Sequence, residues 1–165
     1  SEDLDRWGAE IDSTLTIRFK EPDVLFDAGQ SKLKSTFTVI LDEFFPRYVN
    51  VLRGNKYIAH IEEIRVEGHT SIEGVNGMND NESYFYNMKL SQDRTRSVLE
   101  YGLEQLDPKI LEWTKIRATA NGLSSVKPIE QNETEEGRKQ NRRVEFRIKT
   151  DAEAQIREML RYAGN

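Results

Sequence analysis

The chain has 165 residues and a formal net charge of −5, and 36% of its residues are hydrophobic against 32% charged. Its length suits one domain with some flanking sequence, and the absence of cysteine excludes a disulfide framework and a thiolate metal site. The acidic balance argues against nucleic acid as the main partner, and no apolar run approaches the roughly 20 residues that a membrane-spanning helix needs.

The N-terminal segment predicts a linker followed by a strand. Residues 1–13 are acidic and weakly patterned, which indicates a linker or a short helix, whereas residues 14–19 alternate apolar and polar side chains as a strand does. Pro22 interrupts this pattern because proline has no N–H for a sheet ladder. We expect the strand to resume briefly over residues 24–26 and to end in a turn over residues 27–30.

A first helix and a second strand follow this turn. Ser31 is the expected helix N-cap, and Pro46 is expected to kink or end the helix. Residues 64–68 then alternate apolar and charged side chains and predict a strand that ends at Gly68. The apolar stripe of the helix has helical spacing and consists of Leu33, Phe37, Ile40, Leu41, Phe44 and Tyr48.

The remaining sequence predicts two helices and two strands. A loop rich in Asn and Gly over residues 75–85 leads to a helix over about 87–106, which Asp-Pro closes. Alternation then predicts a third strand over 116–122 and a last strand over 143–149, and the polar segment 132–141 is expected to form a short helix. The last strand lies in a basic run, which is either a solvated strand face or a ligand-facing patch.

The order β-α-β-α-β-(α)-β implies a two-layer α/β sandwich with the helices on one face of the sheet. We expect residues 1–21 to be a linker or N-terminal extension and residues 22–150 to form the domain. Residues 151–165 are expected to form a C-terminal helix, because Ile156 and the apolar residues after it have helical spacing.

One face of the helix expected after the loop carries a candidate anion site. Asn87, Leu90 and Arg94 are spaced i, i+3 and i+7, so they share one face near the expected helix N-terminus. The dipole and free N–H groups there favour an anion, and an arginine can add a bidentate contact to a carboxylate. The alternative is a solvated arginine or a local salt bridge with Glu67 or Asp93.

Several separated motifs occur in a recognisable order: Gly68-His69-Thr70, Tyr86-Asn87, Leu90-Ser91, Arg94, Gly122, Pro128, Glu136-Gly137-Arg138 and Asn141-Arg142-Arg143-Val144-Glu145. In this order and spacing, residues 22–150 resemble the OmpA-like C-terminal domain, a family that includes OmpA, Pal and the stator protein MotB. The resemblance implies non-covalent binding of peptidoglycan in the periplasm, through the stem peptide and its diaminopimelate residue.

The resemblance also implies roles for individual residues. Arg94 corresponds to the family arginine that pairs with the carboxylate of the ligand, and Asn87 and Leu90 correspond to adjoining pocket positions. Thr70 lies in the Gly-His-Thr motif, and Tyr86 either lines the pocket or caps the core. Arg142 and Arg143 are further ligand contacts, or one of them is bonded to the loop after the second strand.

This chain departs from the family at Ser71, where an aspartate normally pairs with the ammonium group of the ligand. A hydroxyl cannot supply that charge, so Glu73 is a candidate substitute, as are Asp80 and Glu82 in the insert. His69 is expected to order the loop, and we expect no metal because no second ligand of suitable spacing is in view.

The leading hypothesis is a peptidoglycan-binding anchor in the periplasm, tethered to the inner or outer membrane through a segment upstream of Ser1. A more specific form of this hypothesis is that the chain is part of a MotB-like stator subunit, including the related Zorya defence type. The sequence leaves open whether such a subunit forms a homodimer. An enzyme is not expected, because the chain shows no Ser-His-Asp order, metal-ligand cluster or paired carboxylates on defined elements. The alternative is a protein-interaction module that keeps the fold but has lost the ligand, as Ser71 suggests.

Overall fold

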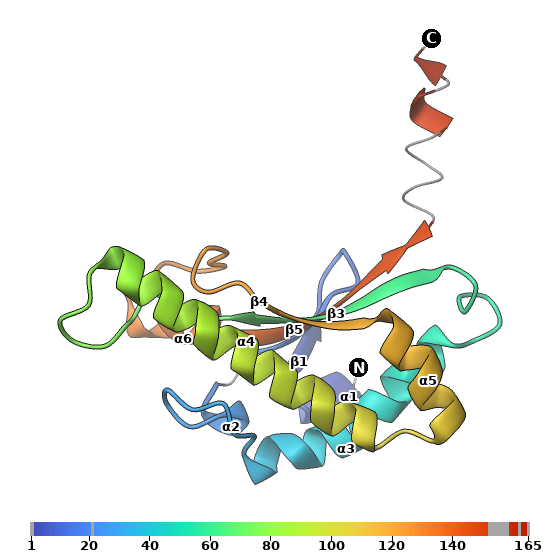
Figure 1. Cartoon of the computed structure of the whole chain (residues 1–165), viewed down its shortest axis with the longest axis horizontal. Coiled ribbons are helices and arrows are strands. Elements are labelled where there is room, and N and C mark those ends of the chain that lie inside the picture. The colour runs from blue at the N-terminus through green and yellow to red at the C-terminus, as the bar shows by residue number, and fades with distance from the viewer. Residues whose placement is uncertain (1, 21, 152–158, 162, 165) are drawn as a thin grey trace.

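The computed structural model describes residues 2–20, 22–151, 159–161 and 163–164. Its elements are α1 (Glu2–Arg6), β1 (Ala9–Ile11), β2 (Ile17–Phe19), α2 (Pro22–Leu25), α3 (Ser35–Leu52), β3 (Ile61–His69), α4 (Asp80–Glu104), α5 (Pro108–Arg117), β4 (Ala118–Gly122), α6 (Glu135–Asn141) and β5 (Arg143–Thr150). The strands form one sheet in the order β1-β2-β5-β3-β4, in which β3 and β4 are parallel and the other neighbours antiparallel. Helices α3, α4 and α5 lie on one side of this sheet (Figure 1).

The expected two-layer α/β arrangement is confirmed, and the alternation of side chains along the strands explains it. Ile64 and Val66 of β3 and Phe146 of β5 are fully buried in the core beneath the helices. The residues between them are charged and lie on the opposite face of the sheet. Phe146 packs edge-on against Phe44 of α3 and Phe19 of β2, with ring centroids 5.0 and 5.8 Å away. The sheet and α3 therefore share one core.

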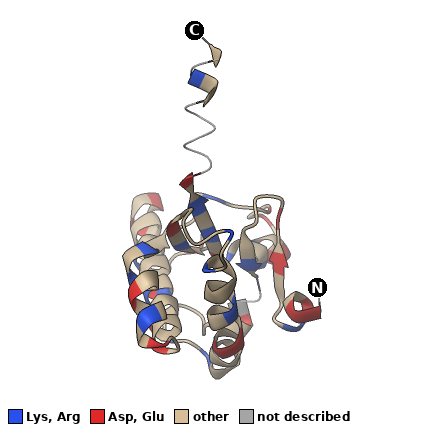
Figure 2. Ribbon diagram, turned by 90° about the vertical axis from the view of Figure 1, so that its right-hand side faces the viewer, with Lys and Arg blue, Asp and Glu red and all other residues tan. Residues whose placement is uncertain are grey.

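The N-terminal segment belongs to this sheet, although we expected residues 1–21 to be a linker or extension. β1 pairs with β2, and β2 in turn pairs with β5. The acidic helix α1 lies beside the N-terminus (Figure 2), where Asp3 accepts a 2.7 Å hydrogen bond from Arg47 of α3. These are long-range contacts, which leave little trace in the local periodicity from which a linker was inferred.

Two prolines lie inside helices where we expected other structure. Residues 24–26 were expected to be a strand, but most of them belong to α2, which begins at Pro22 because proline at the first helical position removes no intrahelical bond. Helix α3 begins after Lys34 rather than Ser31 and continues through Pro46 for six more residues. Buried side chains on both sides of this proline offset the one missing hydrogen bond: Phe44, Phe45, Tyr48, Val49 and Leu52.

The boundaries of α4 and α5 also differ from the prediction. Helix α4 begins at Asp80, seven residues before Asn87, because the Asn79 side chain caps it by accepting a backbone N–H at 2.9 Å. Helix α5 begins at Pro108, which we expected only to close the preceding helix. Ile116 was assigned to a strand, but it lies in the last turn of α5 and is 78% exposed. The third strand begins two residues later as β4.

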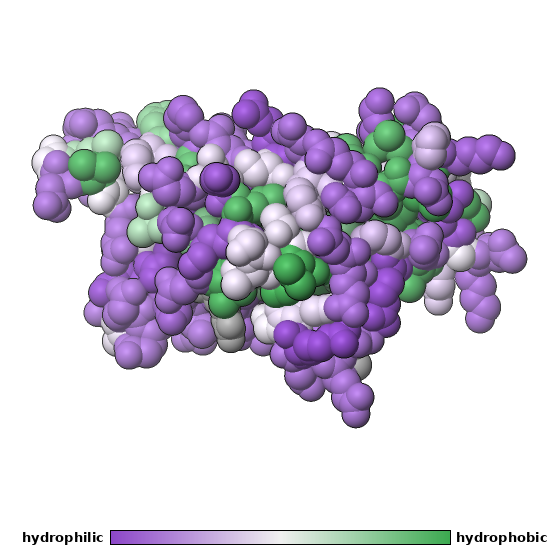
Figure 3. Space-filling view, turned by 90° about the horizontal axis from the view of Figure 1, so that it is seen from below, coloured by the Kyte–Doolittle hydropathy of each residue, from purple (hydrophilic) through white to green (hydrophobic). Residues whose placement is uncertain are grey.

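The short helix expected over 132–141 and the last strand expected over 143–149 are present as α6 and β5. The helix expected over 151–165 falls mainly on residues 152–158, which lie outside the described residues. Seen from the helix side, the surface is mostly hydrophilic with small apolar patches (Figure 3). Among the described residues, no helix is both long and apolar enough to cross a membrane.

Two glycines allow α4 to lie directly on the sheet. A Cβ atom at Gly68 of β3 would lie 2.8 Å from the carbonyl oxygen of Ser91, and one at Gly122 of β4 would collide with the backbone nitrogen of Gln92. The Ser91 hydroxyl also accepts the backbone N–H of Ser124 at 3.1 Å. This close approach fixes α4 beside the loop that follows β3, and both contribute to the candidate site described next.

Candidate functional site

A cleft of about 360 Å³ opens between the loop after β3, the first half of α4, the α2–α3 connection and the junction of α6 with β5. The six residues that we predicted for ligand binding all line it, and so does Glu73. Its full lining is Asp23, Phe26, Ala28, Gly29, Thr70, Ser71, Glu73, Gly74, Tyr86, Asn87, Leu90, Arg94, Glu135 and Arg142. The structure therefore brings together residues that lie more than a hundred positions apart.

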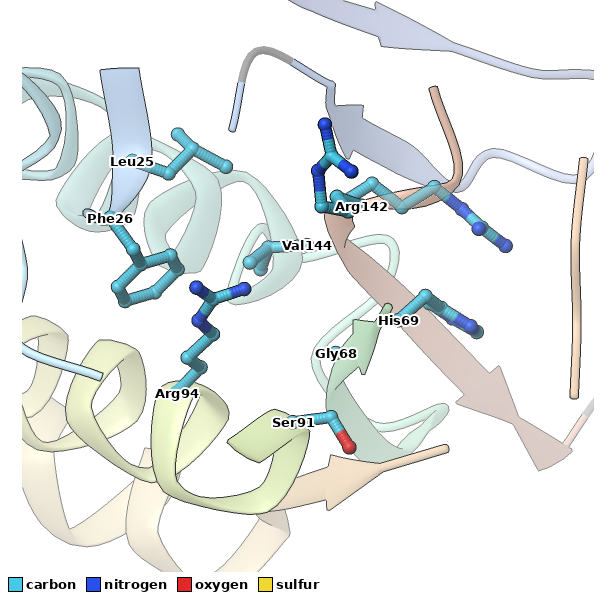
Figure 4. Close-up of a pocket in the computed structure, with 9 residues that line it drawn as sticks. Leu25, Phe26, Gly68, His69, Ser91, Arg94, Arg142 and Val144 are labelled. Carbon is cyan, nitrogen blue, oxygen red and sulfur yellow. The ribbon is translucent and has the colours of Figure 1, made fainter. Parts of the chain in front are cut away.

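Arg94 is the buried cation of this cleft and is 9% exposed. Its Nε donates to the carbonyl oxygen of Gln30 at 2.8 Å, and its Nη2 donates to that of Asp27 at 3.2 Å. The guanidinium also lies 4.8 Å from the ring centroid of Phe26, toward which it points in Figure 4. Burial lowers the pKa of Arg94 to about 10, so its side chain remains charged at neutral pH.

The position of Arg94 overturns one part of the sequence argument. Because α4 begins at Asp80, Arg94 lies more than three turns into the helix rather than near its N-terminus. The helix dipole acts within the first turn, so it does not explain an anion site at Arg94. The attraction for an anion must come from the guanidinium itself.

Two carboxylates and two arginines at the rim of the cleft neutralise each other. The Glu73 carboxylate forms ion pairs with the Arg138 guanidinium at 2.6 Å and with the Arg142 guanidinium at 3.4 Å. The Glu135 carboxylate pairs with the same two guanidinium groups, at 3.0 and 2.8 Å respectively. Hydrogen bonds from Arg142 and then Arg138 lower the pKa of the Glu135 carboxyl, which is therefore ionised at neutral pH. These four side chains together carry no net charge.

The third carboxylate of the cleft, Asp23, lies 3.2 Å from the ammonium group of Lys139. Among the described residues, none of the carboxylates comes within 4.0 Å of Arg94. Asp80 and Glu82, which we considered as substitutes for the family aspartate, lie in the exposed first turn of α4 and do not line the cleft. The cleft thus holds one cation that protein carboxylates do not balance.

The wall formed by the loop after β3 is polar and neutral. The Thr70 backbone N–H donates to the carbonyl oxygen of Ser124 at 2.9 Å, whereas the Thr70 hydroxyl is buried and has no hydrogen-bond partner in the described part of the chain. The Ser71 hydroxyl accepts a long, 3.4 Å contact from Arg142. Asn87 donates its side-chain amide to the carbonyl oxygen of Glu73 at 2.9 Å, which fixes the loop against α4.

Arg142, rather than Arg143, lies in this cleft. The Arg143 guanidinium is buried on the other face of the sheet, where it donates to Glu145 at 2.8 Å and to the carbonyl oxygens of Asn141 and Lys127. Within the basic run, Arg142 lines the cleft, whereas the Arg143 side chain is 3% exposed and pairs with Glu145, so at this position the strand face is neither solvated nor part of the cleft.

The opposite face of the sheet carries a buried ion-pair network. Glu67 of β3 and Glu145 of β5 are directly opposite in the strand register, which would be repulsive without compensation. Burial would raise the pKa of Glu67, but His69, Arg65 and Arg147 outweigh it and lower the pKa to about 2. The His69 ring points away from Arg94 (Figure 4), and its Nε2 lies 3.7 Å from Glu67 and 3.6 Å from Glu145.

The network includes three residues whose side chains can bind metals, although we expected no such cluster. Ligand atoms of Glu67, His69 and Glu145 all lie within 4.8 Å of one another. However, the carboxylate oxygens already accept hydrogen bonds from four arginines, whose positive charge opposes a cation. The arrangement is an ion-pair network on the sheet.

The sequence matches the OmpA family over residues 25–142. The chain is 46% identical over 165 residues to the Zorya protein ZorB of Escherichia coli, in a match that covers 97% of this chain and 68% of ZorB. Its fold is similar to the periplasmic domain of Helicobacter pylori MotB, with a TM-score of 0.62, 17% identity and coverage of 94% and 90% of the two chains. It is also similar to the cell wall anchor of the T6SS from Pseudomonas aeruginosa, with a TM-score of 0.60, 23% identity and coverage of 88% and 90%.

Proposed function

The chain belongs to the OmpA family, and from this membership and the cleft we propose that it binds peptidoglycan non-covalently in the periplasm. In this role it anchors a membrane protein or stator complex to the cell wall. Proteins of similar fold support the proposal, since they include a peptidoglycan-associated lipoprotein, a cell wall anchor and the periplasmic domain of MotB. The 46% identity to ZorB favours the stator version, in which a membrane segment and a second copy complete the assembly.

The observation that carries the proposal is the unbalanced charge of Arg94. A guanidinium has five N–H donors, and the two hydrogen bonds to Gln30 and Asp27 leave three for a ligand. A buried cation without a carboxylate partner is unfavourable, so a ligand carboxylate would be strongly preferred there. The diaminopimelate residue of a stem peptide offers such a carboxylate.

We propose binding without catalysis. The Ser71 hydroxyl faces the cation Arg142 rather than a general base, so nothing at this position removes its proton. The carboxylates at the rim are paired with arginines and a lysine, and hydrogen bonds from Arg142 and Arg138 lower the pKa of Glu135, which makes it a weaker base. Release of soluble muropeptides from sacculi by the purified protein would contradict this part of the proposal.

Co-sedimentation with purified sacculi tests the function. Wild type is expected to sediment with the sacculi, and Arg94→Gln is expected to remain mostly in the supernatant, because it removes the charge that receives the ligand. Arg96→Gln is the matched control, since Arg96 is an exposed arginine on the same helix. Circular dichroism checks that the Arg94 variant is folded.

Two outcomes separate this proposal from its alternative. Equal sedimentation of wild type and a folded Arg94→Gln variant would show that the cleft does not carry binding. If neither sediments while the protein still binds a protein partner, the chain is an interaction module that has kept the fold and lost the ligand.

A further inference from the structure

We infer that the cleft recognises a carboxylate whose neighbouring amine is acylated, and discriminates against a carboxylate beside a free ammonium group. The inference rests on the proposed function, because it specifies which form of the stem peptide the same cleft accepts. It is carried by two observations, the charge balance of the cleft and the chemistry of the wall opposite Arg94.

The charge balance leaves a place for one negative charge and none for a positive charge. Each carboxylate that lines the cleft is already within 3.4 Å of a basic side chain: Asp23, Glu73 and Glu135. Of the basic side chains that the structure describes at the cleft, Arg94 is the one without a carboxylate within 4.0 Å. A ligand that brings an isolated carboxylate neutralises the cleft, whereas a zwitterion brings an ammonium group that must break an existing ion pair or remain unpaired.

The wall formed by Thr70 and Ser71 complements an amide better than an ammonium group. Thr70 and Ser71 line the cleft, and their neutral hydroxyl groups suit the N–H of an acylated amine but cannot balance the charge of an ammonium group. Arg142 lies 3.4 Å from the Ser71 hydroxyl and can donate to the carbonyl oxygen of the acyl group. A free ammonium group at the same place would face the positive charge of Arg142 instead.

Peptidoglycan supplies this chemistry from two sources. When a stem peptide is cross-linked through the side-chain amine of its diamino acid, that amine becomes an amide and the carboxylate on the same carbon remains. The C-terminal carboxylate of any stem peptide also lies beside an acylated amine. Both sources present the same group to Arg94, and a set of synthetic peptides distinguishes them.

The test is calorimetric titration of the 165-residue protein with three forms of a stem tripeptide that ends in diaminopimelate. In all three forms the α-carboxylate of the glutamate is amidated, because it too lies beside an acylated amine. The first form also has its C-terminal carboxylate amidated and its side-chain amine free, so its remaining carboxylate lies beside an ammonium group. The second is the same peptide with the side-chain amine acetylated. The third has a free main-chain carboxylate and a free side-chain amine.

The second peptide is expected to bind at least about tenfold more tightly than the first, because it brings only the carboxylate that Arg94 lacks, whereas the first also brings an ammonium group that stays unpaired. If the third peptide binds like the second, the C-terminal carboxylate is also a source. If it binds like the first, the cross-linked form is the source. Binding of the first peptide as tightly as the second would overturn the inference.

Ser71→Asp provides an independent check, because it places a carboxylate on the wall without altering Arg94. In this variant the preference is expected to reverse, so that the free amine binds more tightly than the acetylated one. Ser71→Ala is the control and is expected to keep the wild-type preference. An unchanged preference in a folded Ser71→Asp variant would count against the inference.

Sacculus co-sedimentation, run in parallel, distinguishes failure of this inference from failure of the proposed function. If sacculi bind in an Arg94-dependent manner but none of the three peptides does, the proposed function stands and the inference about the acylated amine is wrong. If sacculi do not bind at all, the proposed function itself fails.

Discussion

Replacing Glu145 with Gln tests whether the ion-pair network on the sheet stabilises the fold. The Glu145 side chain is 1% exposed, and one of its oxygens accepts from Arg143 at 2.8 Å and from Arg18 at 2.7 Å. Its other oxygen accepts from Arg147 at 3.2 Å. Burial alone would raise the pKa of Glu145, but Arg143 and Arg18 outweigh it and lower the pKa, so the native state holds the carboxylate ionised.

The expected loss of unfolding free energy depends on which arginine loses its only carboxylate partner. Arg18 also pairs with Glu10 and Asp12, so it retains its compensation. Arg143 loses the one carboxylate that pairs with it among the described residues and keeps neutral oxygen acceptors, and its side chain is 3% exposed. Leaving a buried charge unpaired costs about 3 kcal/mol of unfolding free energy or slightly more. We therefore expect Glu145→Gln to destabilise the protein by about that amount.

Urea unfolding followed by circular dichroism measures this change, with the midpoint falling and the slope unchanged. Glu62→Gln is the matched control, because Glu62 is 44% exposed and lies 3.8 Å from Lys149, where a surface pair contributes at most about 0.5 kcal/mol. Adding Arg143→Met to Glu145→Gln should recover part of the loss, since it removes the unpaired charge. A Glu145→Gln variant within 0.5 kcal/mol of wild type, as judged against the usual error of about 10–15% in such extrapolations, would refute the reasoning.

Three further predictions concern stability. The pKa of Glu67 is lowered from 4.5 to about 2, so the contribution of Glu67 to stability is complete at higher pH and is lost as the pH falls. The unfolding free energy of the wild type should therefore decline between about pH 5 and pH 3, and Glu67→Gln should remove about 2 kcal/mol of that decline. An unchanged pH profile in Glu67→Gln would exclude this role. Gly122→Ala should cost about 1–3 kcal/mol in urea unfolding, because its Cβ collides with α4, whereas Gly164→Ala, which meets only ordinary contacts, should change little. Tyr48→Phe should leave the unfolding free energy unchanged or raise it by up to about 1 kcal/mol, because the buried Tyr48 hydroxyl has no hydrogen-bond partner among the described residues. The melting temperature measures this change, and a clear fall would show that the hydroxyl is hydrogen-bonded.

The sequence predicts the parts of the fold that have strong local periodicity and misses those that depend on distant contacts. The apolar stripe from Leu33 to Tyr48 and the alternation in β3 and β5 are sufficient to place the sheet and α3. The early start of α4 was missed because Asn- and Gly-rich sequence resembles a loop, although a single capping residue, Asn79, is enough to begin a helix there. The contact between α1 and α3 depends on Asp3 and Arg47, which lie 44 positions apart.

The candidate site shows the same division. Thr70, Ser71 and the residues of α4 could be grouped from motif spacing, but the wall contributed by the α2–α3 connection could not, because Arg94 meets Gln30 across 64 positions. The choice between Arg142 and Arg143 depends on strand geometry, since one residue along a strand reverses the face on which a side chain lies. Whether the grouped residues bind ligand stays a prediction until it is measured.

The bonds that hold Arg94 to Gln30 and Asp27 have a consequence for affinity. A free arginine side chain loses about 2 kcal/mol of rotamer entropy when it is immobilised, and here that loss is incurred during folding rather than on ligand binding. The α2–α3 connection therefore holds the Arg94 side chain in place before the ligand binds. Lengthening this connection should weaken binding through a less favourable entropy of association, even though no residue that touches the ligand has changed.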